Sequence, residues 1–260
     1  MIDSQARPPT EAAAARQASR VERVLQASTG LLIAAFAGVH LANVAAAARP
    51  GAYDAVQRVV RVAYQFPPLE LLLLISIALH ALLGVRAMRR ARAPTSRLPV
   101  RLRVHRYAGW YLLSVVALHV GAVRGLAVLE GAPPRFAGLS FSVAWLPWLF
   151  APYYALLALS GLFHGAYGCA LALATLGRPV LARLVKRPGF VGALAAGTMA
   201  ILVGLAGIAG LLYDVGDPFD NPYAAVYRKY LGSFVPGPKP SNDREAAQET
   251  PEIPGTTSRR

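Results

Sequence analysis

Five long apolar stretches, almost free of Asp, Glu, Lys and Arg, constrain this sequence more than any other feature. A helix of about 20 residues rises about 30 Å, the thickness of the hydrocarbon layer of a bilayer. Charged residues make up only 15% of the chain, against roughly 25% in soluble proteins. The sequence therefore predicts an all-α integral membrane protein with five transmembrane helices, over Val24–Ala47, Leu69–Met88, Tyr107–Val128, Trp148–Leu176 and Phe190–Tyr213.

Proline and glycine separate these stretches. Pro67 and Pro68 precede the second stretch, and a Pro-Gly pair at Pro188 precedes the fifth, as expected where helices begin. We therefore expect an N-terminal segment over residues 1–23, a five-helix membrane domain over 24–213, and a C-terminal tail over 214–260. That tail is rich in Pro, Ser, Glu and Thr from Gly232 onward, which is typical of partial disorder.

The basic residues predict the orientation. The formal net charge is +14, and most of the 27 Lys and Arg residues lie in three segments. These are the N-terminal segment and the connections between the second and third and between the fourth and fifth helices. Positive loops remain in the cytoplasm, so we expect a multi-pass protein of the bacterial inner (cell) membrane with a cytoplasmic N-terminus and an external C-terminus. This pattern argues against nucleic acid as a partner.

Four of the five histidines lie singly within the first four expected helices. With the predicted orientation, His40 and His119 both lie on the external side of their helix midpoints, and His80 and His164 both lie on the inner side. Ionisable residues inside a membrane are costly and indicate function. The sequence therefore predicts an outer pair, His40 with His119, and an inner pair, His80 with His164.

Two imidazoles from facing helices are the usual axial ligands of a low-spin haem iron. We therefore interpret the first four helices as a haem-binding bundle that holds two haem b groups, one per histidine pair. Two alternatives remain. Each histidine could simply hydrogen-bond a neighbouring helix, and a zinc site is less compatible because no Cys or carboxylate lies near the histidines.

Four motifs resemble the cytochrome b subunits of succinate dehydrogenase and fumarate reductase. "STGLLIAAFAGVHLANV" (Ser28–Val44) resembles the first helix of that family and "LELLLLISIALHALLG" (Leu69–Gly84) the second. "HRYAGWYLLSVVALHV" (His105–Val120) is similar to the third, and "GLFHGAYG" (Gly161–Gly168) to part of the fourth. The fifth stretch shows no comparable motif. The nearest branch is the single-chain, five-helix, dihaem one.

This resemblance implies a function in a complex. The chain would anchor a flavoprotein subunit and an iron–sulfur subunit on the cytoplasmic face and relay electrons between the iron–sulfur subunit and a membrane quinone, menaquinone rather than ubiquinone. It would be the subunit of an oxidoreductase that does not bind the dicarboxylate. The alternatives are a cytochrome b of another membrane dehydrogenase, of hydrogenase or formate dehydrogenase type, and a haem-free membrane anchor or transporter.

Polar residues near the expected helix ends complete the set of candidates. Family members can carry a carboxylate for quinone proton exchange near the outer haem, and here Asp54 and Glu70 are the candidates, although Glu70 also suits a helix N-terminus. Residues that could contact haem propionates are His105, Arg106 and Arg86 at the inner level and Arg124 at the outer level. The arginines are equally explained by the positive-inside pattern.

Small residues near the histidines suggest how the rings are accommodated. Ser76 and Ser160 each precede an inner histidine by one helical turn and could orient its ring. Tyr53, Tyr64 and Gln65 could contact a quinone. Several glycines could leave room for a macrocycle or serve helix packing, namely Gly38, Gly84, Gly121, Gly161, Gly165 and Gly168.

Overall fold

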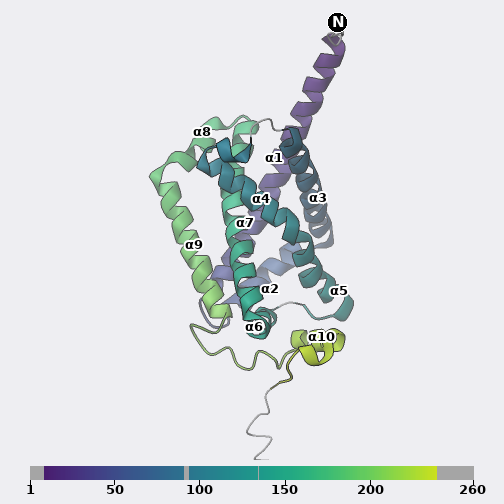
Figure 1. Cartoon of the computed structure of the whole chain (residues 1–260), viewed down its shortest axis with the longest axis vertical. Coiled ribbons are helices and arrows are strands. Elements are labelled where there is room, and N and C mark those ends of the chain that lie inside the picture. Colours follow the sequence, from purple (N-terminus) through teal and green to yellow (C-terminus); the bar gives the residue numbers. More distant parts are fainter. Residues whose placement is uncertain (1–8, 91–93, 134, 239–260) are drawn as a thin grey trace, which may run out of the picture.

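The computed structural model describes residues 9–90, 94–133 and 135–238 (Figure 1). Within these ranges the regular structure is entirely helical. Five helical segments are long and apolar enough to cross a membrane, over Gln17–Ala46, Pro67–Arg90, Val100–Glu130, Pro147–Thr175 and Pro188–Ile208. The expectation of an all-α protein with five candidate spans is confirmed.

The spans correspond to α1 (Pro9–Ala46), α3 (Pro67–Arg90), α4 (Val100–Val120), α7 (Pro147–Thr175) and α9 (Pro188–Ile208). Proline occupies the first turn of α7 and of α9, where its missing N–H has no helical partner to lose. α4 continues through a π-helical segment, η2 (Gly121–Gly125), into α5 (Leu126–Glu130).

Two ends differ from the sequence-based boundaries. α1 begins at Pro9, so the segment expected to precede the first helix is helical over most of its described part. α9 ends at Ile208 instead of Tyr213. Gly210 has a φ of 73°, and the Leu211 N–H donates to the Ala206 carbonyl at 2.9 Å. A left-handed glycine with this hydrogen bond ends a helix.

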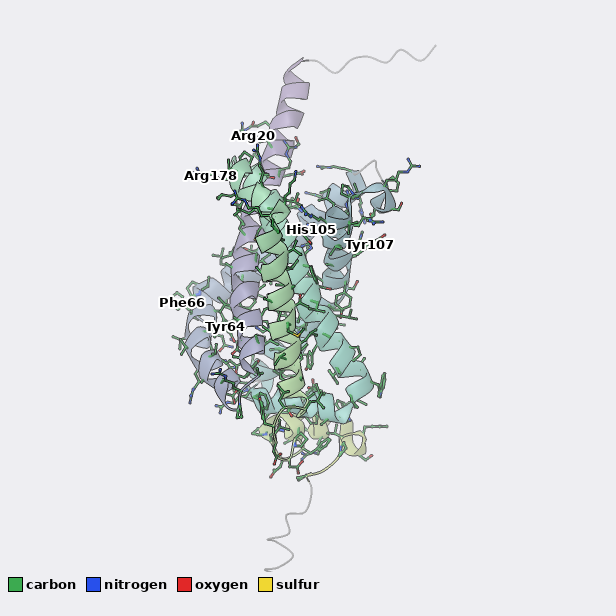
Figure 2. All side chains as sticks on the ribbon, turned by 90° about the vertical axis from the view of Figure 1, so that its left-hand side faces the viewer. Arg20, Tyr64, Phe66, His105, Tyr107 and Arg178 are labelled. Carbon is green, nitrogen blue, oxygen red and sulfur yellow. The ribbon has the colours of Figure 1, made fainter. Side chains whose placement is uncertain are left out.

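Short helices outside the spans were not anticipated. α2 (Ala52–Tyr64), α6 (Phe136–Trp145) and α10 (Pro222–Leu231) gather at one end of the molecule, here called the α6 end (Figure 1). α8 (Pro179–Ala182) lies at the other end, here called the α8 end, where Arg20 and Arg178 also lie (Figure 2). α10 falls within the expected C-terminal tail, and residues 239–260 of that tail lie outside the described ranges.

Four helices form a bundle in the spatial order α3, α1, α7, α4. α1 packs against α3 and α7, and α7 also packs against α4. In the described part of the chain, α1 with α4 and α3 with α7 are not close packing neighbours. The Glu70–Arg124 ion pair joins α3 to the continuation of α4 and closes the ring of four helices, so these two combinations are the diagonals of the bundle. α9 packs on the outside, against α1 and α7.

α9 approaches α1 through two glycines. A Cβ atom on Gly204 would collide with the Val44 carbonyl and lie 2.8 Å from the Ala45 Cα. A Cβ on Gly207 would collide with the Ala47 carbonyl, to which the Tyr213 hydroxyl donates at 2.6 Å. Small residues at such crossings allow backbones of membrane helices to touch. The fifth span, which carries no recognisable motif, thus depends on glycine for its docking.

Aromatic packing closes the α6 end. Phe141 of α6 is fully buried and stacks on Trp145 with ring centroids 5.7 Å apart. Tyr223 of α10 packs on the same Phe141 at 6.3 Å. The Asn221 side chain accepts the Ala224 N–H at 2.9 Å and caps α10. α6 and α10 therefore form one layer beneath the bundle.

Replacement of Gly207 by valine should destabilise the protein by about 1–3 kcal/mol, because the new side chain would overlap the α1 backbone. Thermal unfolding of the purified protein in detergent measures the change. Gly192→Ala is the matched control, since it lies in the same helix with nothing within 4 Å of an added Cβ. Equal stability of the two variants would contradict the close approach of α9 to α1.

Candidate functional site: two histidine pairs across a four-helix bundle

The structure brings the four bundle histidines together as two pairs. The ring centroids of His40 (α1) and His119 (α4) are 6.3 Å apart, with planes at 72°. Those of His80 (α3) and His164 (α7) are 6.1 Å apart, with planes at 89°. Each pair spans one diagonal of the bundle. These are the two pairings that the sequence predicts.

The pairs lie at two levels along the bundle. The His80 ring faces Gly30 of α1, and His40 lies ten residues further along the same helix. The His164 ring faces Gly109 of α4, and His119 again follows ten residues later. Ten helical residues correspond to about 15 Å. Because the spacing is the same on α1 and α4, the two pairs are separated by the same distance along both helices. The His40–His119 pair lies nearer the α6 end.

A glycine brings the His80 ring onto the backbone of α1. A Cβ on Gly30 would lie 2.9 Å from His80 Cε1. The His80 Nδ1 lies 3.1 Å from the carbonyl oxygen of Gln26, one turn before Gly30. The Thr29 hydroxyl lies 3.4 Å from the same nitrogen. Because a carbonyl oxygen can only accept, Nδ1 carries the proton, and Nε2 retains its lone pair.

The His164 ring makes the same contact on α4. A Cβ on Gly109 would lie 2.9 Å from His164 Cε1. The His164 Nδ1 donates at 3.0 Å to the carbonyl of His105, again one turn before the glycine. The two inner rings are therefore held by one repeated device. A glycine removes the Cβ, and the exposed carbonyl one turn earlier fixes the tautomer.

The His105 ring, which comes from α4, makes the same kind of contact with the backbone of α7. It stacks on His164, with centroids 4.1 Å apart and planes at 8°. Its Nδ1 donates at 3.1 Å to the His164 carbonyl, and a Cβ on Gly168 would lie 3.1 Å from its Cε1. α4 and α7 are thus joined by two reciprocal imidazole–carbonyl hydrogen bonds. His105 belongs to the surroundings of the inner pair.

The His40–His119 pair has an aromatic environment. The His40 ring stacks on Phe36 at 5.8 Å, and Phe36 meets Tyr64 edge-on at 5.6 Å. His119 Nδ1 lies 3.2 Å from the hydroxyl of Tyr153, which comes from α7. A hydroxyl can donate or accept, so this contact leaves the tautomer of His119 open. Tyr64, one of the sequence candidates, lies close to this pair through Phe36.

Glu70 and Arg124, which the sequence suggests for separate roles, bind each other. Arg124 Nη2 donates to Glu70 Oε2 at 2.9 Å, and Arg124 Nε donates to Oε1. Arg124 lies in the π-helical segment directly after His119, and such segments often occur at functional sites. A bidentate pair neutralises two charges that would be costly near the apolar layer.

The arginines proposed at the inner level also have protein partners. Arg86 lies 3.9 Å from Glu22 of α1, and Arg90 forms a hydrogen bond to the same carboxylate. Arg106 donates to the Thr95 hydroxyl at 3.4 Å. These contacts join the ends of α1 and α3 and anchor the start of α4.

Asp54 has a structural contact. Its Oδ1 accepts the backbone N–H of Phe136, the first residue of α6, at 3.0 Å. The cap position of that helix, Arg135, makes no such hydrogen bond through its own side chain. Asp54 therefore supplies a helix cap from a different element, α2.

Sequence reasoning missed the groups that orient the inner rings. The sequence suggests Ser76 and Ser160 for this role, but the inner Nδ1 atoms hydrogen-bond main-chain carbonyls, and that of His80 also lies 3.4 Å from the Thr29 hydroxyl. Gly30 and Gly109 were visible only as motif positions, and their common ten-residue distance to the next histidine was the available signal. Asn43 was also missed. It is 3% exposed, and its Oδ1 has no hydrogen-bond partner in the described structure.

Most of the glycines noted in the sequence do not face a histidine ring. Gly161 and Gly165 face Leu41 and Ala34 of α1 at about van der Waals distance, which identifies them as packing residues. Gly84 faces Gln26 at 3.4 Å. Gly38 and Gly121 are exposed and have nothing within 4 Å of an added Cβ.

Comparison with protein-family models, with curated proteins and with solved structures gives no match for this chain. The arrangement must therefore be interpreted from its own geometry. No cluster of three or more His, Cys, Asp or Glu suitable for a metal ion occurs among the described residues. What the bundle offers is two pairs of imidazoles, each pair with ring centroids about 6 Å apart.

Replacement of Gly30 or Gly109 by alanine should weaken the inner pair. The added Cβ would lie 2.9 Å from the facing imidazole, which must move away from its carbonyl acceptor. We expect a loss of about 1–3 kcal/mol in unfolding free energy and a changed Nδ1 signal in ¹⁵N NMR of histidine-labelled protein. Gly38→Ala, on the same helix as Gly30, is the control. Unchanged histidine signals in both inner variants would contradict the proposed contact.

Proposed function

We propose that this protein is a dihaem cytochrome b that anchors a succinate:quinone oxidoreductase, a succinate dehydrogenase or fumarate reductase, in the membrane. One observation carries the proposal: two histidine pairs, each across a diagonal of one bundle, about 15 Å apart along its axis. The first four spans supply one histidine each, and cofactor sites in bundles are built from side chains on facing helices.

The ring separations support two iron sites. A metal-bound imidazole nitrogen lies about 2 Å from the metal, and the ring centroid lies roughly 1 Å beyond it, so two axial imidazoles have centroids roughly 6 Å apart. The observed separations of 6.3 and 6.1 Å agree with this value. Hydrogen bonding to a neighbouring helix accounts for the Nδ1 contacts of His80 and His164, but it gives no reason for the two ring pairs across the bundle.

The tautomers support the same interpretation. His80 and His164 hold their Nδ1 protons on backbone carbonyls, so each offers an Nε2 lone pair to a metal. All four histidines are partly exposed residues although they lie within the bundle. Haem iron, when bound, supplies one-electron transfer, and the protein contributes orientation and an apolar surrounding.

The partners and substrate class rest on the four motifs. They favour a flavoprotein and an iron–sulfur subunit at the α8 end, which the positive-inside pattern makes the cytoplasmic end of a protein in a bacterial inner membrane. Electrons would pass between these subunits and menaquinone at the α6 end. Propionates of the two haems are assigned to Arg86, His105 and Arg106 at the inner level and to Arg124 at the outer level.

We place the quinone proton exchange at Glu70. It lies in the first turn of α3 and binds Arg124, whose segment follows His119. Tyr64 lies beside His40 through Phe36, and the buried Asn43 oxygen needs a donor from outside the described structure. Asp54 is the second candidate, and its carboxylate, like that of Glu70, has a partner, since it caps α6.

Reduced-minus-oxidised spectra of the purified protein test the proposal. We expect two b-type haems per chain, because each histidine pair offers one site. His80→Ala and His164→Ala should remove the same haem signal, and His40→Ala and His119→Ala should remove the other. Loss of different signals within one pair would contradict the pairing.

A variant without a role at the rings provides the control. Cys169→Ala, in the same helix as His164, should retain both haems. Absence of any Soret band would exclude a cytochrome and favour a haem-free anchor or transporter. Copurification with a hydrogenase or formate dehydrogenase would instead assign the chain to another membrane dehydrogenase.

Replacement of Glu70 by glutamine should slow succinate-to-quinone electron transfer by roughly 100-fold, because a proton-exchanging carboxylate is lost. Both haem signals should remain. Glu130→Gln, at the same end of the molecule, should have no such effect. If instead Asp54→Asn abolishes turnover while Glu70→Gln does not, the proton exchange belongs to Asp54.

A further inference from the structure

α2 has an inverted amphipathic pattern. Val59, Val62 and Phe66 are 76%, 79% and 58% exposed and follow one another at helical spacing along α2 and just past its end. Tyr53 and Gln57 of α2 are buried. Burial raises the pKa of the Tyr53 phenol, which therefore stays neutral, and Gln57 Nε2 lies 3.4 Å from its hydroxyl.

This pattern places α2 at the surface of the bilayer. The helix has 13 residues and connects the end of α1 to the start of α3. It would measure only about 20 Å and cannot cross the hydrocarbon layer. A helix with an exposed apolar stripe at such a position lies in the interface, with its apolar side chains among the upper parts of the acyl chains. Figure 2 shows Tyr64 and Phe66 at the side of the molecule toward the α6 end.

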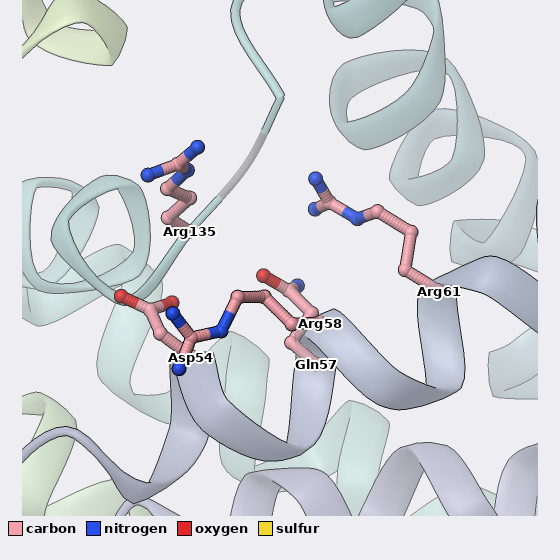
Figure 3. A pocket seen from close by; sticks show the side chains of 5 residues that line it. All are labelled: Asp54, Gln57, Arg58, Arg61 and Arg135. Atoms are coloured by element: carbon pink, nitrogen blue, oxygen red, sulfur yellow. The ribbon is translucent and has the colours of Figure 1, made fainter.

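A small cavity lies against the other side of α2. Its volume is about 60 Å³, and it is lined by Asp54, Gln57, Arg58, Arg61 and Arg135. Figure 3 shows the four α2 side chains directed to the side on which Arg135 approaches from the segment before α6. Three guanidinium groups and a single carboxylate line this cavity, and that carboxylate accepts the Phe136 N–H. The cavity therefore carries an excess of positive charge.

We propose that this cavity binds the phosphate group of an anionic phospholipid from the leaflet at the α6 end. Guanidinium groups bind phosphate through paired hydrogen bonds. The apolar stripe of α2 fixes the cavity at the level where lipid headgroups lie. Val59, Val62 and Phe66 would contact the acyl chains of the same or a neighbouring lipid.

This site is independent of the histidine pairs. Its lining residues come from α2 and from the segment before α6, whereas the four histidines lie on α1, α3, α4 and α7. The site predicts a lipid requirement that would hold for a haem protein and for a haem-free anchor alike. Its failure would leave the histidine arrangement unaffected.

Native mass spectrometry of the full-length protein, delipidated in detergent and then titrated with phosphatidylglycerol or phosphatidylcholine, tests the proposal. We expect tight binding of phosphatidylglycerol alone. The double variant Arg58→Gln/Arg135→Gln should bind it roughly tenfold or more weakly, because charge-assisted hydrogen bonds are lost. Arg49→Gln is the matched control, an exposed arginine just before α2. Thermal unfolding in phosphatidylcholine should be equal for all three proteins, which verifies that they are folded.

Four results would overturn the lipid assignment. Equal retention of the two lipids would show that the headgroup charge is not recognised. An equal effect of Arg49→Gln would show that only the net charge matters. Competition by inorganic phosphate at millimolar concentration would identify free phosphate as the ligand. Loss of haem from the double variant with unchanged lipid binding would assign the arginines to a haem carboxylate.

Discussion

The contact on which the candidate site depends is an imidazole resting on a helix backbone at a glycine. His80 at Gly30, His164 at Gly109 and His105 at Gly168 each place Nδ1 on the carbonyl one turn earlier. The missing Cβ permits the approach, and a carbonyl that already accepts its helical N–H can accept a second hydrogen. Such a contact satisfies a polar group within the membrane. It also decides which ring nitrogen is left for a ligand.

The packing of the four helices places the two histidine pairs at different positions along the bundle axis. Because α1 and α4 occupy one diagonal and α3 and α7 the other, each histidine pair faces the interior without direct helix packing between its members. The ten-residue step from Gly30 to His40 and from Gly109 to His119 sets both levels. α9 stands outside this arrangement and supports α1 through the Gly204 and Gly207 contacts. The five spans therefore divide into four that build the site and one that braces it.

The α6 end is organised by polar contacts between segments far apart in the chain. Glu70 binds Arg124, Asp54 caps α6, and Tyr213 donates to Ala47. Charged groups near an apolar layer need partners because water is scarce there. Two residues that looked like free acids in the sequence are thus engaged in the structure. Arg58 and Arg61 of α2 and Arg135 line one cavity at this end, together with Asp54.

The sequence by itself determined the five spans and the two histidine levels. The length of an apolar stretch and the position of a residue within it can be read directly from the sequence. In a helix that crosses a bilayer, that position gives the depth of the residue in the membrane. It did not determine α2, α6 or α10, because these short helices depend on packing at the α6 end. Only the tertiary structure decided that Gly30 and Gly109 hold the inner rings, that Glu70 binds Arg124 and that Asp54 caps α6. Each of these contacts joins residues more than 50 positions apart, and their partners depend on how the helices pack.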